Sequence, residues 1–119
     1  MKFSVEVTVF DALGEKLRRD REKALRGLGA VAAALKDPER VFSALYQVAV
    51  RLGISFVVAR VREMMLPIRV EPVYDPAGQH IIGFRLMSHQ PIPQSTVSEL
   101  VDRFLEGFGE ALRQLVEGA

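Results

Sequence analysis

The chain has 119 residues, a length typical of one domain, and 49% of them are hydrophobic, enough for a core without cross-links. It contains no cysteine, which excludes disulfide bonds, thiolate metal sites and a cysteine nucleophile. Its 16 basic residues nearly balance 15 acidic ones, for a net charge of +1, so overall charge does not indicate a nucleic-acid partner. No apolar run reaches the roughly 20 residues that span a bilayer. We therefore expect a single α+β domain, residues 1–119, in the cytoplasm and not in a membrane.

Apolar and polar residues alternate over residues 2–9, which predicts a half-buried strand and not a signal peptide. Asp11 then suits the N-cap of a long first helix. The run Asp37-Pro38-Glu39 predicts the start of a second helix. That helix is expected to end near Leu52, because Gly53 is well placed as a C-terminal stop.

Three more strands are expected in the second half of the chain, at about Ile54–Arg62, Ile68–Tyr74 and His80–Met87. Pro72 indicates that the middle one is an edge strand or contains a bulge, and Asp75-Pro76-Ala77-Gly78 forms the turn after it.

The last helix is expected from Val97 to near the C-terminus, and Thr96 with Glu99 fits a capping box at its start. The predicted fold is therefore a four-stranded antiparallel sheet in the order strand, helix, helix, strand, strand, strand, helix. Its helices pack on one face.

If Ile54–Arg62 is a strand, its side chains alternate between two unlike faces. One face is small and apolar, and the other carries Phe56, Arg60 and Arg62 beside aliphatic residues. Were that face open, it would offer a platform for stacking bases and cations for a phosphate backbone. Residues on the later strands extend this set: Arg69, Tyr74, Phe84 and Arg85. The alternative is that the aromatic side chains pack under helices and the arginines only line the rim.

A basic ridge on the first helix strengthens the binding hypothesis. Its four members follow spacings of three, four and three residues and so share one helical face: Lys16, Arg19, Lys23 and Arg26. Such a ridge attracts phosphates and releases counterions on binding. The alternative is a solvated helix face, partly neutralised by Glu15 and Glu22.

Signals for catalysis are weak. Neither His80 nor His89 lies in a metal-binding pattern, and no carboxylate close in sequence completes a triad with Ser88 and His89. We therefore expect no enzyme, no catalytic residue, no metal and no cofactor.

The last helix predicts self-association. Val97, Val101, Phe104, Phe108, Ala111 and Leu115 follow alternating spacings of four and three residues, as in a coiled-coil seam or bundle stripe. A second apolar line contains Leu105, Leu112 and Val116. One line can cover the chain's own sheet, and the other then needs a partner, because long exposed apolar strips are rare on monomers. We expect a homo-oligomer formed through Val101, Phe104, Leu105, Phe108, Leu112 and Leu115. The alternative is one wide stripe that faces a single core.

In its order of elements, in its arginine and aromatic residues near a cleft and in its apolar last helix, the chain resembles the ThermoDBP-related family of archaeal single-strand nucleic-acid-binding proteins. The resemblance covers most of the chain and implies a cleft between helices and sheet with apolar walls and basic rims. It also implies oligomers that bind single-stranded DNA or RNA without strong sequence preference. The run Phe104-Leu105-Glu106-Gly107-Phe108-Gly109 is similar, more remotely, to the apolar helix of the small ligand-binding domains named after vinyl reductases.

The leading hypothesis is thus a non-catalytic protein that binds single-stranded nucleic acid through a basic and aromatic cleft. In one version of this hypothesis the cleft is open, and in another the binding site is weak or occluded. Two alternatives stay open. One is a homo-oligomeric structural or interaction module. The other is a domain with a small-molecule pocket between helices and sheet. Neither alternative binds nucleic acid.

Overall fold

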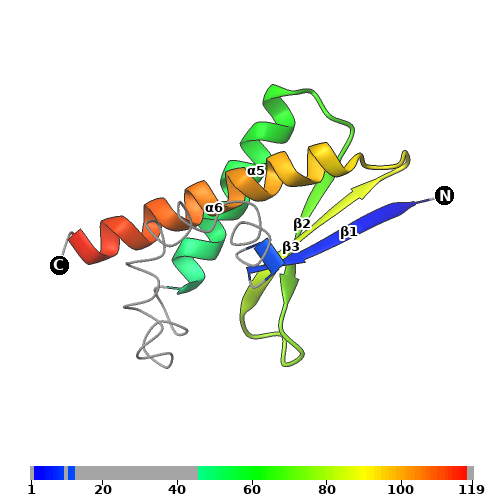
Figure 1. Cartoon of the computed structure of the whole chain (residues 1–119). Helices are drawn as coiled ribbons and strands as arrows, with labels where there is room; N and C mark the ends of the chain where they lie inside the picture. Colours follow the sequence, from blue (N-terminus) through cyan, green and yellow to red (C-terminus); the bar gives the residue numbers. More distant parts are fainter. Residues whose placement is uncertain (1, 10, 13–45, 118–119) are drawn as a thin grey trace.

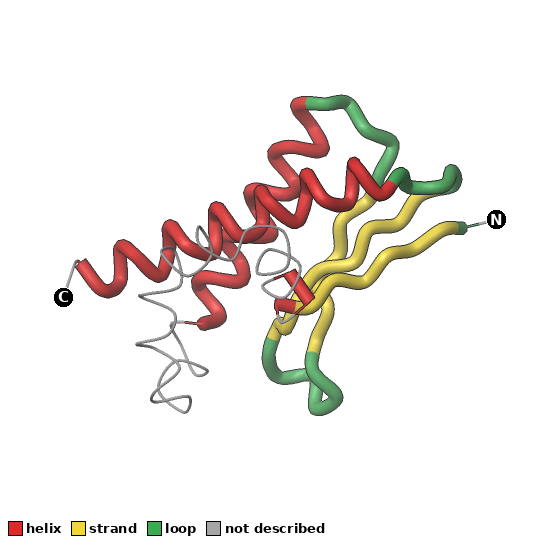
Figure 2. The backbone as a smooth tube through the Cα atoms, in the orientation of Figure 1, coloured by secondary structure: helices red, strands yellow, loops and turns green. Residues whose placement is uncertain are grey.

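A computed structural model of the chain describes residues 2–9, 11–12 and 46–117, without the side chains of residues 46, 112 and 115–117. Its elements are β1 (Phe3–Thr8), α5 (Tyr46–Glu63), β2 (Arg69–Tyr74), β3 (Ile81–Ser88) and α6 (Gln94–Glu117). Figures 1 and 2 show α5 and α6 crossing beside a small twisted sheet. The α+β class is confirmed, while the helices expected between residues 13 and 45 lie outside the described residues. Neither α5 nor α6, searched over its described residues, is long and apolar enough to cross a membrane.

The described sheet has three antiparallel strands in the order β1-β3-β2. Phe84 in the central strand β3 pairs with Val7 on one side and with Pro72 on the other. Of the two alternatives for Pro72, the edge position is the one found, because β2 lies at the margin of the described sheet, where a residue without an N–H is tolerated. The expected fourth strand is wrong, because its residues belong to a helix.

Residues 54–62 continue helix α5 and do not form a strand. Val57 and Val61 are buried, but Ser55 and Ala59, which strand alternation would place on the same face, are exposed. Burial therefore follows the helical period of about 3.6 residues and not the strand period of 2. The two-faced strand predicted from the sequence does not exist.

Gly53 does not end the helix but lets α5 approach α6 closely. A Cβ atom on Gly53 would lie 2.7 Å from the backbone oxygen of Phe104. On the opposite helix, a Cβ on Gly107 would lie 2.9 Å from the Cα of Gly53 and 2.9 Å from the ring of Phe56. Each glycine thus removes a side chain where the two backbones meet, which explains a glycine in the interior of each helix.

The start of α5 is tied to the central strand through Gln47. Its amide nitrogen donates to the backbone oxygen of Ile81 at 2.9 Å, and its amide oxygen accepts from the Ile81 N–H at 2.8 Å. This side chain therefore pairs both backbone groups of Ile81 as a neighbouring strand would.

The helix starts differ from the predicted ones. Thr8 and Asp11 exchange side-chain to backbone hydrogen bonds, each of 3.1 Å, so Thr8 and not Asp11 is the N-cap of the helical residues that begin at Val9. Helix α6 begins at Gln94, with the Pro93 backbone oxygen accepting from the N–H of Val97. The expected capping box at Thr96 is therefore wrong.

The core lies between the two helices and one face of the sheet. The ring of Phe104 in α6 is 5.0 Å from that of Phe84 in β3 and 6.0 Å from that of Phe108, measured between centroids. Leu86 of β3 and Val57 of α5 are also fully buried in this cluster. Phe84 is consequently a core residue and not a platform for stacking bases.

Candidate functional site

The end of α5 forms a Schellman motif that builds a concave surface. The N–H of Met65 donates to the backbone oxygen of Arg62 at 3.1 Å, and the N–H of Leu66 donates to that of Val61 at 3.0 Å. These two bonds satisfy backbone groups that a helix end leaves unpaired. The motif turns the chain towards β2 and brings Leu66 next to Val61.

Met65 occupies the position in this motif where glycine is usual. Its φ is +52°, in the left-handed region, which side chains with a Cβ adopt at a cost of about 1 kcal/mol or more. The side chain is also 89% exposed, so burial does not compensate for this conformation. An exposed apolar side chain at a strained position is a feature found at functional sites.

An open groove of about 530 Å³ lies between this helix end and β2. The residues that line it are Val58, Val61, Arg62, Met65, Leu66, Ile68 and Val70. Six of these seven residues are aliphatic or thioether side chains, and the volume falls within the range of about 300–1,000 Å³ typical of small-ligand sites. The sheet contributes one wall and the helix the other.

Arg62 is the one charged residue in the lining, and it is exposed. Within residues 2–9, 11–12 and 46–117, no ion pair involves Arg62 or Arg51. The other described arginines each contact a carboxylate at 2.5 to 3.2 Å: Arg60, Arg69, Arg85, Arg103 and Arg113. In the part of the chain that the structure describes, no carboxylate therefore compensates the positive charge of Arg62 at this groove.

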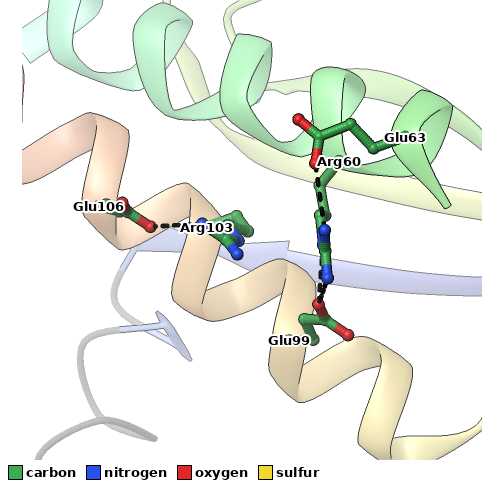
Figure 3. A network of polar contacts seen from close by, with 5 residues as sticks. All are labelled: Arg60, Glu63, Glu99, Arg103 and Glu106. Atoms are coloured by element: carbon green, nitrogen blue, oxygen red, sulfur yellow. Dashed lines mark hydrogen bonds and ion pairs between the residues drawn. The ribbon is translucent and has the colours of Figure 1, made fainter.

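Arg60, which the sequence placed beside Arg62, instead joins the two helices (Figure 3). Its Nε and Nη2 atoms donate to Glu99 Oε1 at 2.8 and 2.5 Å, and its Nη1 donates to Glu63 Oε2 at 3.1 Å. The hydrogen bonds to Glu99 and then Glu63 raise the pKa of Arg60 above its ordinary value. Its guanidinium group is thus occupied in holding α5 against α6.

The other predicted nucleic-acid contacts do not gather into one cleft. Phe56 packs against Gly107 of α6 and is half-buried. Arg69 and Arg85 lie on the sheet face opposite the core, where Arg69 pairs with Glu71 and Arg85 with Glu6 of β1, both at 3.2 Å.

Tyr74, at the end of β2, is 53% exposed. The basic ridge falls outside the described residues: Lys16, Arg19, Lys23 and Arg26.

The predicted oligomerisation surface is mostly covered by the chain itself. Val101, Phe104, Leu105 and Phe108 are all buried in the core that α6 shares with α5 and the sheet. Both apolar lines of α6 therefore face one core as far as they are described, which fits one wide stripe. The side chains of the two remaining residues, Leu112 and Leu115, lie outside the description, so the described residues do not support a homo-oligomer.

Of the two histidines, His80 contacts a carboxylate in the turn between β2 and β3. His80 Nδ1 lies 3.3 Å from Asp75 Oδ2 in the β2–β3 turn, where Gly78 has a φ of +70°. Asp75 Oδ1 accepts from the backbone N–H of Gln79 at 2.9 Å, and this bond, with those from His80, holds the Asp75 pKa below its ordinary 3.8. These contacts stabilise a hairpin turn. No group of three potential metal ligands occurs among the described residues.

Comparison with family models, curated proteins and solved structures gave no match for this chain. The family resemblance inferred from the sequence therefore stays a prediction. A pocket between helices and sheet was one of the alternatives, but of the residues that line this groove only Arg62 was named as a site residue. One further signal was present in the sequence: two consecutive methionines, Met64 and Met65, follow a segment whose apolar residues also fit a helical period.

Proposed function

We propose that the chain is a non-catalytic binding protein whose groove between the end of α5 and β2 holds the apolar part of a small ligand. The observation that supports this function is Met65, an exposed apolar side chain held at positive φ on a groove whose other lining residues, except Arg62, are aliphatic. A flexible, polarizable methionine adapts to ligands of different shape. Burial of apolar surface supplies the affinity in such a site.

The experiment measures binding of decan-1-ol, a neutral aliphatic probe, below the concentration at which it aggregates. Side-chain methyl NMR signals of Val58, Leu66 and Val70 are expected to shift together, and the melting temperature is expected to rise with probe concentration. Shifts confined to other parts of the chain, or no binding at all, would contradict the proposal.

Two methionine variants make this test specific. Met65→Gly removes a lining side chain and restores the residue that the Schellman position favours, so it should raise stability by about 1 kcal/mol. It should also weaken decan-1-ol binding by roughly three- to tenfold, because about 1 kcal/mol of apolar contact is lost. Met64→Ala is the matched control, because Met64 is its exposed neighbour but does not line the groove. Equal affinities for all three proteins would place the ligand elsewhere.

Single-stranded nucleic acid is the second candidate ligand, and one observation favours it. Arg51 and Arg62 are eleven residues apart in α5, which places both on one exposed helix face, and neither pairs with a described carboxylate. Two guanidinium groups on one face that pair with no described carboxylate suit a phosphate backbone.

The affinity for an oligo-dT strand should then fall steeply with salt, and the double change Arg51→Gln, Arg62→Gln should reduce the logarithmic salt slope by about 1.4, the sum of two phosphate contacts. An unchanged slope, or no binding at low salt, would rule out this surface.

A further inference from the structure

We infer that the ligand of the groove is an aliphatic monocarboxylate, whose chain lies along the apolar walls and whose carboxylate pairs with Arg62. This inference rests on the proposed function, and it adds the chemical class of the ligand. An apolar groove alone selects for hydrophobicity, and a charged group at its rim selects for a head group of opposite charge.

The state of Arg62 is what points to an anion. Five other described arginines satisfy their guanidinium groups with a carboxylate of this chain, yet Arg62 does not pair with one in the described residues. Its closest acidic neighbour in sequence, Glu63, contacts Arg60 instead, at 3.1 Å. No carboxylate of the described residues therefore occupies the hydrogen-bond donors of Arg62, and an anion from outside can bind there.

The charge of the groove favours a carboxylate over a phosphate monoester. Arg62 is the one charged residue in the lining, so the rim offers a single positive charge. A phosphate monoester carries about 1.5 to 2 negative charges at neutral pH and would be only partly compensated there. A carboxylate carries one charge, and its two oxygens match the planar fork of a guanidinium group.

The other lining residues lie on both sides of Arg62 in the chain, so a head group paired with Arg62 has apolar side chains near it. Val58 and Val61 lie on the preceding turn of α5, and Met65 and Leu66 follow the helix end. The aliphatic chain then lies against these side chains and against Ile68 and Val70. A ligand with one polar end and an unbranched apolar body fits this arrangement.

The test compares decanoate with decan-1-ol, two probes with the same chain length and different head groups, on the full chain. The unmodified protein is expected to bind decanoate about three- to tenfold more tightly than decan-1-ol, a range set by an exposed charge-assisted pair. This preference should shrink as ionic strength rises. Arg62→Gln should abolish the preference and leave decan-1-ol affinity nearly unchanged, and Arg62→Lys should keep part of it.

Arg51→Gln is the matched control, because Arg51 is also exposed and without a described ion pair in α5 but lies outside the groove. It changes the net charge by the same amount and should keep the preference for decanoate. Equal affinity for the two probes in the unmodified protein would overturn the monocarboxylate and leave the apolar groove intact. Equal loss in both glutamine variants would overturn the role of Arg62. Binding of neither probe would instead refute the proposed function itself.

Discussion

The contact between Gly53 and Gly107 gives the sharpest prediction for the fold. The change is Gly107→Ala, which adds one methyl group where α6 crosses α5. The new Cβ would lie 2.9 Å from three atoms: the Cα of Gly53, the backbone oxygen of Leu52 and a ring carbon of Phe56. Two of these atoms belong to the backbone, which cannot move without shifting a helix. Gly109→Ala is the matched control, because its Cβ would meet no described atom within 4 Å.

The two substitutions should shift stability in opposite directions. In a helix interior, alanine is favoured over glycine by about 0.5–1 kcal/mol, and Gly109→Ala should gain this amount. Gly107→Ala gains the same term but brings carbon atoms well inside their optimal separation of about 3.5–4.0 Å. Overpacking of this kind costs about 1–3 kcal/mol. The net expectation for Gly107→Ala is a loss of about 1–2 kcal/mol in the free energy of unfolding.

Urea unfolding followed by far-UV circular dichroism measures both effects at constant temperature. The urea midpoint should fall for Gly107→Ala and rise for Gly109→Ala, with the same dependence on urea for all three proteins. In thermal unfolding, the two variants should differ by roughly 10 °C at about 4 °C per kcal/mol. If both variants were stabilised, helix propensity alone would explain the data. If both were destabilised, a general loss of flexibility would explain them. Either result would refute the close approach of α5 and α6 at Gly107.

Two further predictions concern polar contacts. Asp75→Asn should lower the urea midpoint at neutral pH, because the folded state holds the pKa of Asp75 below 3.8. The ionised carboxylate therefore stabilises the fold at pH values above 3.8. The difference in midpoint from the unmodified protein should vanish as the pH falls through the lower pKa of the folded state. A midpoint difference independent of pH would show that the charge is not involved. Arg60→Met and Glu99→Gln should each lower stability and, in a double-mutant cycle, together lower it by less than the sum, whereas additive losses would show that their hydrogen bonds contribute nothing.

Much of the fold follows from local sequence patterns. Strands β1, β2 and β3 were predicted within one or two residues, because alternation, an edge proline and a turn with a glycine at positive φ are local signals. The apolar stripe of α6 was predicted as well, since it repeats over several turns. What the pattern could not specify is the partner of that stripe: its described residues, including Leu105, pack within the chain's own core.

The helix predicted to end near Leu52 is confirmed over residues 46–52, but the strand predicted at residues 54–62 was wrong because that segment fits two periods. Residues 54–62 are rich in valine and isoleucine, which favour strands, and the preceding Gly53 is a common helix stop. The helix is selected by tertiary contacts: Gly53 admits the backbone of Phe104, and buried Val57 and Val61 recur every four residues. Contacts with α6, about 50 residues later in the chain, override the local propensity, and no single window of sequence contains them.

Because residues 54–62 form a helix and not a strand, the side chains of Arg60 and Arg62 point in different directions. On a strand, Arg60 and Arg62 would point to the same side, because side chains two residues apart share a face. On a helix they diverge by about 200°, since each residue turns the chain by about 100°. Arg60 accordingly reaches across to Glu99 and holds the helices together, whereas Arg62 is left at the mouth of an apolar groove. Replacing both arginines at once would weaken the fold and the groove together. Separate substitutions, with Arg51 as the control, are therefore needed to measure binding.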